Sequence, residues 1–117
     1  MIVPDPPYTV TLTADPVAIP ANGVSTSMLT AMVTDRYGNP VADGTPVTFI
    51  TDLGTLDGSN SVVRLTTGGV ATAILTSSRT DGPATVTAVC EGKEDQVYVV
   101  FYRYAFRIYL PVLFKPE

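Results

Sequence analysis

The sequence predicts an all-β fold in which seven to eight strands form a two-sheet β-sandwich. Apolar and polar residues alternate in short runs, roughly ten residues apart, as expected of strands with one buried face. Gly, Pro, Asp and Asn separate these runs, and no apolar series follows the period of a helix. Thr, Val, Gly and Pro are abundant while Lys, Glu and Gln are scarce, which also favours strands and turns over helices.

The length and composition indicate one globular domain. A chain of 117 residues buries roughly two thirds of its unfolded surface, enough for one core. The hydrophobic fraction of 45% and the charged fraction of 15% are values of a folded protein.

The first strand is expected to follow a Pro-rich linker, residues 1–8. Val10 and Leu12 lie on its buried side, with threonines on the other side. Pro16 and Pro20 interrupt the pattern. Because proline cannot donate to a strand ladder, the segment between them is expected at a sheet edge, where the chain changes or ends its pairing.

The remaining strands follow the same alternation, with turn residues between them. They are expected over residues 25–34, 46–51, 61–66, 70–76, 84–90 and 96–102. Their inward side chains are expected to be Leu29, Ala31, Val33, Val47, Phe49, Ala71, Ala73, Leu75, Val86, Ala88, Cys90, Val97, Val99 and Phe101.

The stretch from Asp35 to Pro40 raises the question whether a turn is only a connector or also a binding site. Gly38 and Asn39 tolerate positive φ, and Pro40 has a fixed φ, so these residues suit a chain reversal. The reversal returns Val41 to the apolar side. Backbone geometry therefore explains the motif without a ligand.

Four segments, in this order and spacing, resemble a bacterial immunoglobulin-like domain of group 1: "PANGVSTSMLTAMVTDRYGNPVADGTPVTF", "GTLDG", "TTGGVATAILTSS" and "GPATVTA". The resemblance covers residues 9–102. This family forms the repeats in the stalks of invasin- and intimin-type adhesins. It implies an immunoglobulin-like sandwich, tandem neighbours in the parent protein, and a role in extending that protein from the cell.

The chain departs from antibody-type domains, which carry a disulfide with a Trp packed on it. Cys90 is the only cysteine and there is no Trp, so no internal disulfide forms. Cys90 is expected to be a small buried apolar side chain rather than part of an intermolecular bridge.

Catalysis is not expected, and no catalytic, cofactor-binding or metal-binding residues are assigned. The chain has no His, which excludes a Ser-His-acid triad and removes the commonest general base. Carboxylates could in principle form a glycosidase pair or a calcium site. Turn capping is the favoured interpretation of these acids, which are Asp35, Asp43, Asp52 and Asp57.

Charge and hydropathy exclude other classes. The formal net charge of −4 and the lack of clustered Lys or Arg argue against a nucleic-acid partner. No apolar run is long enough for a helical membrane span. The first residues lack the pattern of a secretory signal, so the targeting signal is expected outside this segment.

The aromatic tail, residues 103–117, is the least explained stretch. Its apolar residues alternate with others, so it is expected to be an added strand packed on the sandwich. The alternative is a contact surface for the next segment, another copy or the cell envelope.

Two functions remain open. The first is a non-catalytic structural or adhesive module of a secreted or surface-attached protein, with adjacent domains as partners and a monomeric state in isolation. The second is an accessory domain of an extracellular enzyme, which could grip carbohydrate through exposed tyrosines. A flat exposed row of rings would favour the second, and scattered or buried rings the first. The candidate rings are Tyr8, Tyr37, Tyr98, Tyr102, Tyr104 and Tyr109.

Overall fold

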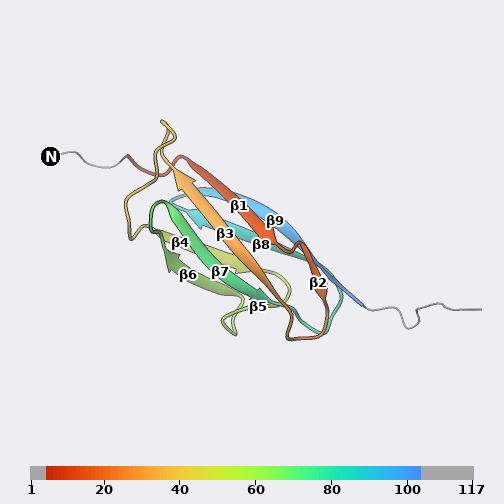
Figure 1. Cartoon of the computed structure of the whole chain (residues 1–117). Helices are drawn as coiled ribbons and strands as arrows, with labels where there is room; N and C mark the ends of the chain where they lie inside the picture. The colour runs from red at the N-terminus through yellow and green to blue at the C-terminus, as the bar shows by residue number, and fades with distance from the viewer. Residues whose placement is uncertain (1–4, 104–117) are drawn as a thin grey trace, which may run out of the picture.

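The computed structural model describes residues 5–103 as a sandwich of two packed sheets, which confirms the predicted immunoglobulin-like fold (Figure 1). The strands are β1 (Thr9–Asp15), β2 (Ala18–Pro20), β3 (Thr26–Thr34), β4 (Pro46–Thr51), β5 (Thr55–Leu56), β6 (Ser61–Leu65), β7 (Val70–Thr76), β8 (Gly82–Cys90) and β9 (Lys93–Tyr102). Strands β1, β3, β7 and β5 form one sheet, and β2, β9, β8, β4 and β6 form the other. The predicted tail strand lies outside the described residues.

The core is the set of inward side chains that the alternation predicted. Leu29, Val47, Phe49 and Leu75 are fully buried, and Phe101 is almost so. Of the predicted inward side chains, only Val97, in the middle of β9, is half-buried, and it still packs against the core. Two layers of aliphatic and aromatic side chains therefore hold the sandwich together without a disulfide.

The prolines near residue 16 mark a change of sheet, as expected of an edge segment. Strand β1 pairs antiparallel with β3, whereas β2 pairs parallel with β9 at the edge of the other sheet. The peptide bond between Asp15 and Pro16 is cis. The buried Ser27 hydroxyl donates a 2.7 Å hydrogen bond to the Pro16 carbonyl, so β3 holds the chain at this crossing.

Several details differ from the sequence prediction. The described residues form nine strands where seven to eight were expected, and β9 begins at Lys93 where residue 96 was expected. The segment around Leu56, expected to be a turn, includes the two-residue strand β5, since Leu56 is fully buried and pairs with Leu75. Strand β8 begins earlier than expected, at Gly82. Pro83 lies opposite Val100, whose N–H donates to the Val17 carbonyl on the other side of β9. The Pro83–Val100 pair therefore needs no N–H from the proline, and the sheet accommodates it.

Candidate functional site

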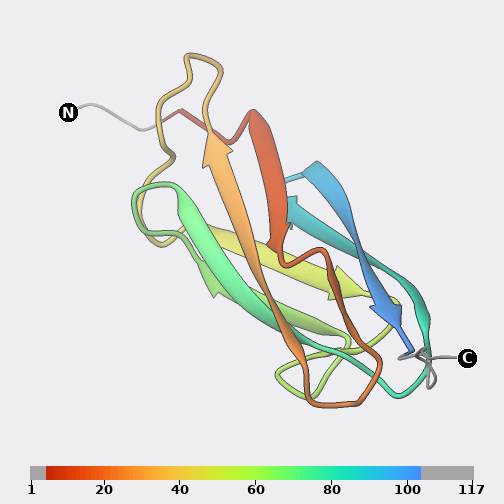
Figure 2. The same cartoon turned by 45° about the vertical axis from the view of Figure 1, so that its right-hand side comes forward.

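The first and last strands run in the same direction, so the chain enters and leaves at opposite ends of the sandwich (Figures 1 and 2). We call these ends the N-terminal pole, which includes Tyr8 and Thr34, and the C-terminal pole, which includes Gly82 and Tyr102. In many domains the chain termini lie close together. Here the poles are separated by the length of the strands, of which β9 alone, with ten residues, spans about 33 Å.

The loop from Asp35 to Val41 at the N-terminal pole is organised by the Asp35 carboxylate. Its Oδ1 atom accepts hydrogen bonds of 2.9 Å from the N–H groups of Tyr37 and Asn39. Gly38 has a φ of 82°, and Val41 returns to the core with 4% of its surface exposed. The turn-capping interpretation of Asp35 is confirmed.

Replacing Asp35 with alanine should lower the free energy of unfolding by about 1–2 kcal/mol, because two loop N–H groups lose their acceptor. Urea denaturation measures this loss. Asp35→Asn is the matched control, since its amide oxygen can still accept both bonds and should preserve most of the stability. Equal losses in the two variants would contradict this role of the carboxylate.

The N-terminal pole also holds the segment that leads into β1. Pro7 is buried, and the N–H of Tyr8 donates to the Thr34 carbonyl at 2.8 Å. The Lys93 ammonium lies 5.6 Å from the centre of the Tyr8 ring, within the range of a cation–π contact. An open groove beside this segment is lined by Pro6, Pro7, Tyr8 and Arg36. The incoming chain is thus attached to the sandwich before β1 begins.

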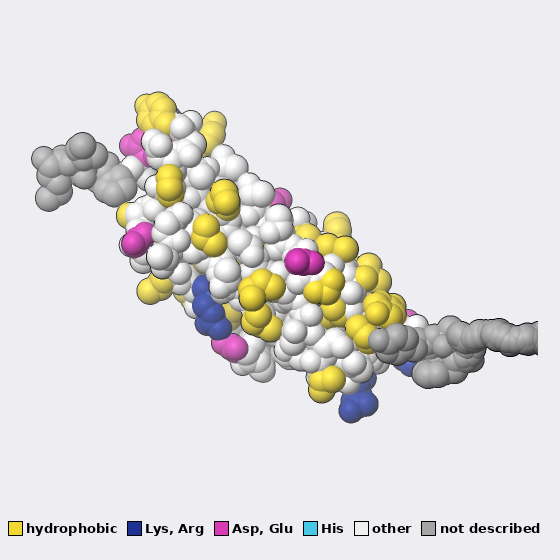
Figure 3. All heavy atoms as spheres, in the orientation of Figure 1, with side chains coloured by type: hydrophobic (Ala, Val, Ile, Leu, Met, Phe, Trp, Pro, Cys, Tyr) yellow, Lys and Arg dark blue, Asp and Glu magenta, His cyan; other side chains and the backbone are white. Residues whose placement is uncertain are grey.

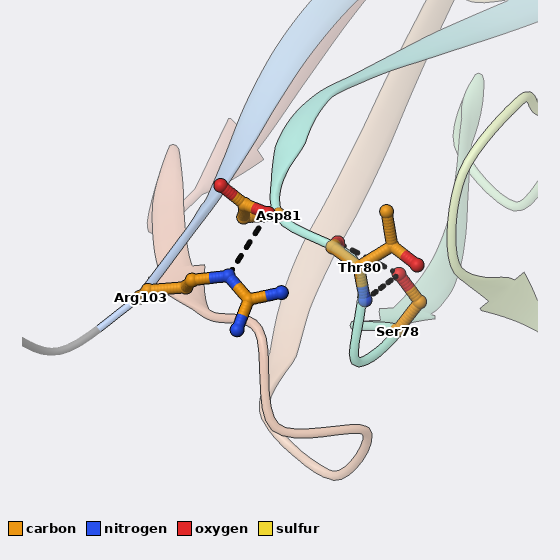
Figure 4. Close-up of polar contacts among 4 residues, drawn as sticks. All are labelled: Ser78, Thr80, Asp81 and Arg103. Atoms are coloured by element: carbon orange, nitrogen blue, oxygen red, sulfur yellow. Dashed lines mark hydrogen bonds and ion pairs between the residues drawn. The ribbon is translucent and has the colours of Figure 1, made fainter.

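The C-terminal pole is closed by an ion pair between Arg103 and Asp81 (Figure 4). Arg103 Nε donates to Asp81 Oδ1 at 3.0 Å, which joins the residue after β9 to the residue before β8. Beside it, the hydroxyl of Ser78 accepts from the N–H of Thr80. The hydrogen bond from Arg103, a backbone hydrogen bond of Asp81 itself and the Arg103 charge lower the pKa of the Asp81 carboxyl below its ordinary value.

The folded pKa of Asp81 is lower than the unfolded one, so the pair stabilises the fold above the unfolded pKa and loses this effect as the pH falls through the folded pKa. Arg103→Ala should raise the pKa of Asp81 toward its ordinary value, which carboxyl NMR titration measures. Because both side chains are exposed, the change in stability near neutral pH should be small. An unchanged pKa in the variant would contradict the pairing.

Each of the four acids considered as a catalytic or calcium site forms its own structural contact, Asp35 in the loop described above. Asp43 accepts from the N–H of Gly68 at 2.9 Å, and Asp52 accepts from the N–H of Thr85 at 2.8 Å. Asp57 pairs with Arg64. Within residues 5–103, no group of three or more acidic, His or Cys side chains is arranged to hold a metal ion.

Cys90 is buried with 1% of its surface exposed, as predicted. Burial, and after it the negative charge of Glu91, raises the pKa of the Cys90 thiol. Since the thiolate is the reactive form, this environment suits an inert core residue and not a nucleophile.

The described tyrosines fall into two groups. Tyr8 and Tyr37 lie at the N-terminal pole, whereas Tyr98 and Tyr102 point outward from β9 with Val100 between them. Tyr104 and Tyr109 lie outside the described residues. On the side that carries β1, β3 and β7, hydrophobic side chains form small separate groups over much of the face and gather more densely toward the C-terminal pole, and charges are few (Figure 3).

Two contacts that connect the strands were not predicted. Asp95 Oδ2 accepts a 2.8 Å hydrogen bond from the N–H of Leu12, 83 positions away in the sequence. Ser27 binds the Pro16 carbonyl across the sheet crossing. No local pattern in the sequence distinguishes these two side chains from other polar residues near strand ends.

No helix within residues 5–103 is long and apolar enough to cross a membrane.

The fold is shared with several bacterial proteins of known structure. The adhesin InvE of Yersinia pseudotuberculosis is 32% identical with a TM-score of 0.70, and the match covers 84% of this chain and 28% of InvE. Invasin, a bacterial integrin-binding protein, is 31% identical with a TM-score of 0.71 over 82% of this chain and 19% of invasin. A C-terminal intimin fragment, solved with the intimin-binding domain of its receptor Tir, is 28% identical with a TM-score of 0.68 over 82% of this chain and 34% of the fragment.

The similarity extends in shape to parts of enzymes. A family 2 glycosyl hydrolase of Bacteroides cellulosilyticus has a TM-score of 0.71 at 21% identity, over 86% of this chain and 15% of the enzyme. Identity this low supports a common fold alone. No curated protein matches the sequence.

All of these proteins are several times longer than the matched region, so the chain corresponds to one domain within each of them. The family described as "Invasin, domain 3" matches residues 7–102. The chain therefore belongs to the invasin domain 3 family, the immunoglobulin-like domains of invasin- and intimin-type adhesins.

Proposed function

We propose that this chain is a non-catalytic spacer module that lengthens a secreted or surface-attached bacterial protein, with adjacent domains of that protein as its partners. The observation that carries the proposal is the position of the two poles. Because β1 and β9 run in the same direction, each domain of this kind adds its own length to a row of domains. A domain whose chain entered and left at one end would not do so.

The contacts at the poles support the same role. At the N-terminal pole, the buried Pro7 and the bond from Tyr8 to Thr34 fix the direction in which the preceding chain joins the sandwich. At the C-terminal pole, the Arg103–Asp81 pair connects the residue after β9 to the residue before β8. Connections that are held against the sandwich in this way favour a stiff row of domains over a flexible one.

Small-angle X-ray scattering from one, two and three tandem copies of the chain tests the proposal. The maximum dimension should increase by a constant step for each copy, of at least roughly the 33 Å length of β9. A variant with a long Gly/Ser linker between copies is the control and should be more compact on average than a stiff row of the same length. Tandem copies that fold back on one another would contradict the spacer function.

The second candidate is a carbohydrate-binding accessory domain of an extracellular enzyme. The outward pair of rings on β9, Tyr98 and Tyr102, favours it, because exposed aromatic rings can stack on sugar rings. If this candidate is right, the chain should bind insoluble polysaccharides, and Tyr98→Ala should weaken the binding while Tyr37→Ala should not. Absence of binding by the unmodified chain across a panel of polysaccharides would exclude it.

A further inference from the structure

We infer that the parallel pairing of β2 with β9, assisted by the bond from Leu12 to Asp95, is a clamp that keeps this domain folded when the chain is pulled at both ends. The inference rests on the proposed spacer function for its biological setting, since a spacer in a surface protein transmits tension. The clamp itself follows from how the first and last strands are connected.

The pairing of β2 with β9 is short but firmly attached at both ends. Three residue pairs form its register: Ala18–Val100, Ile19–Phe101 and Pro20–Tyr102. At the start of the pairing, the N–H of Val100 donates to the carbonyl of Val17, the residue before β2, at 2.8 Å. At its end, the N–H of Ala21, the residue after β2, donates to the Tyr102 carbonyl at 2.8 Å.

Side chains hold the same strands from inside. Ile19 has 3% of its surface exposed and Phe101 has 1%, so sliding β2 along β9 would drag both out of the core. The core contact therefore resists the same movement that the backbone bonds resist. It also excludes water from one side of this pairing.

The direction of tension decides how these bonds are loaded. Tension on the N-terminal side pulls β1 and then β2 toward the N-terminal pole, and tension on the C-terminal side pulls β9 toward the C-terminal pole. Parallel strands pulled from opposite ends slide past each other, so all bonds between them carry the load together. Strands pulled from the same end separate one bond at a time.

The bond between Leu12 and Asp95 protects the pairing at an earlier step. Strands β1 and β9 lie side by side in the two views, but no ladder joins them among the described residues (Figures 1 and 2). Instead, the Asp95 carboxylate accepts the N–H of Leu12 at 2.8 Å. Before tension can reach β2, β1 must lose this bond together with its seven pairs to β3.

Single-molecule force spectroscopy on the full chain, fused at both termini to reference domains, tests the clamp. Ala21→Pro removes the N–H that bonds Tyr102. At constant force this variant should survive for a time about fivefold shorter than the unmodified chain, the factor expected from the loss of one net hydrogen bond. Survival under force follows the unfolding rate, so it reports the step in which the clamp opens.

Ser59→Pro is the matched control. It also removes one backbone N–H donor, to the Leu56 carbonyl, but in the turn after β5 and not between the first and last strands. Chemical denaturation of both variants measures their losses of equilibrium stability, so that their lifetimes under force can be compared at matched loss. A lifetime shortened equally in the two variants would overturn the inference.

A second pulling geometry keeps the inference testable if either proline variant fails to fold. Val24, in the loop after β2, is 74% exposed, whereas the native thiol of Cys90 is buried. In the V24C variant, the pulling handle therefore attaches at the thiol introduced at position 24 and not at Cys90. Tension between residue 24 and the C-terminus opens β2 and β9 from the Pro20–Tyr102 end, one bond at a time.

The V24C geometry should unfold at a clearly lower force than end-to-end pulling. Equal forces in the two geometries would overturn the clamp even if scattering from tandem copies supports the spacer. The converse result is an unfolding force that is higher in end-to-end pulling than in the V24C geometry, together with tandem copies that fold back on one another. That result would support the clamp and contradict the spacer function.

Discussion

Replacing Phe49 with alanine should lower the free energy of unfolding by about 3–5 kcal/mol, the range measured when a buried aromatic side chain is removed. Phe49 has no exposed surface. It lies in the middle of β4, between Ala88 of β8 and Val62 of β6. The small side chain of Ala88 cannot fill the space that the ring leaves, so a cavity forms and adds to the lost burial.

Two controls separate this effect from a general sensitivity of β4. Phe49→Leu keeps much of the apolar volume and should cost less than Phe49→Ala. Ile50→Ala changes the next residue, which points outward and is 41% exposed, so it should cost least of the three. Urea denaturation gives the three values. A loss for Ile50→Ala as large as that for Phe49→Ala would mean that the core lies on the other face of β4.

The faces of the long strands could be predicted because burial there repeats every second residue. In β3, the alternation of Leu29, Ala31 and Val33 with Met28 and Met32 is visible in the sequence and holds in the structure. Strand β5 could not be found in this way. It has two residues, Thr55 and Leu56, which are too few to display a period among the Gly, Asp and Ser that surround them.

The pairing of strands was harder to predict than their faces, because it depends on residues far apart in the chain. Pro16 and Pro20 indicated an edge segment and a change of pairing, but nothing near them identifies β9 as the new partner. Asp95 lies in a stretch of charged residues that suggests only an exposed turn. Its carboxylate becomes a contact between the first and last strands once the sheets pack. The spacer geometry and the clamp both depend on such contacts.

Replacing Gly54 tests the packing between the sheets at the C-terminal pole. The backbone at Gly54 lies too close to β7 and β9 to carry a side chain. Its φ is 77°, in the left-handed region that favours glycine. A Cβ atom at this position would lie 2.5 Å from the Thr76 carbonyl oxygen and 2.8 Å from Cζ of Phe101. The first contact is with backbone at the end of β7, so a change of rotamer cannot relieve it.

Gly54→Ala should therefore lower the free energy of unfolding by about 2–5 kcal/mol, the sum of backbone strain and steric overlap. Gly58→Ala is the matched control, because its φ is 79° but a Cβ atom there would meet nothing within 4 Å. It carries the strain without the overlap and should cost about 1 kcal/mol. The difference between the two variants, measured by urea denaturation, isolates the close approach of residue 54 to β7 and β9. Equal losses of unfolding free energy in the two variants would mean that these strands do not pack as closely as described. The position of the Phe101 ring, which packs beside the pairing of β2 with β9, would then be wrong as well.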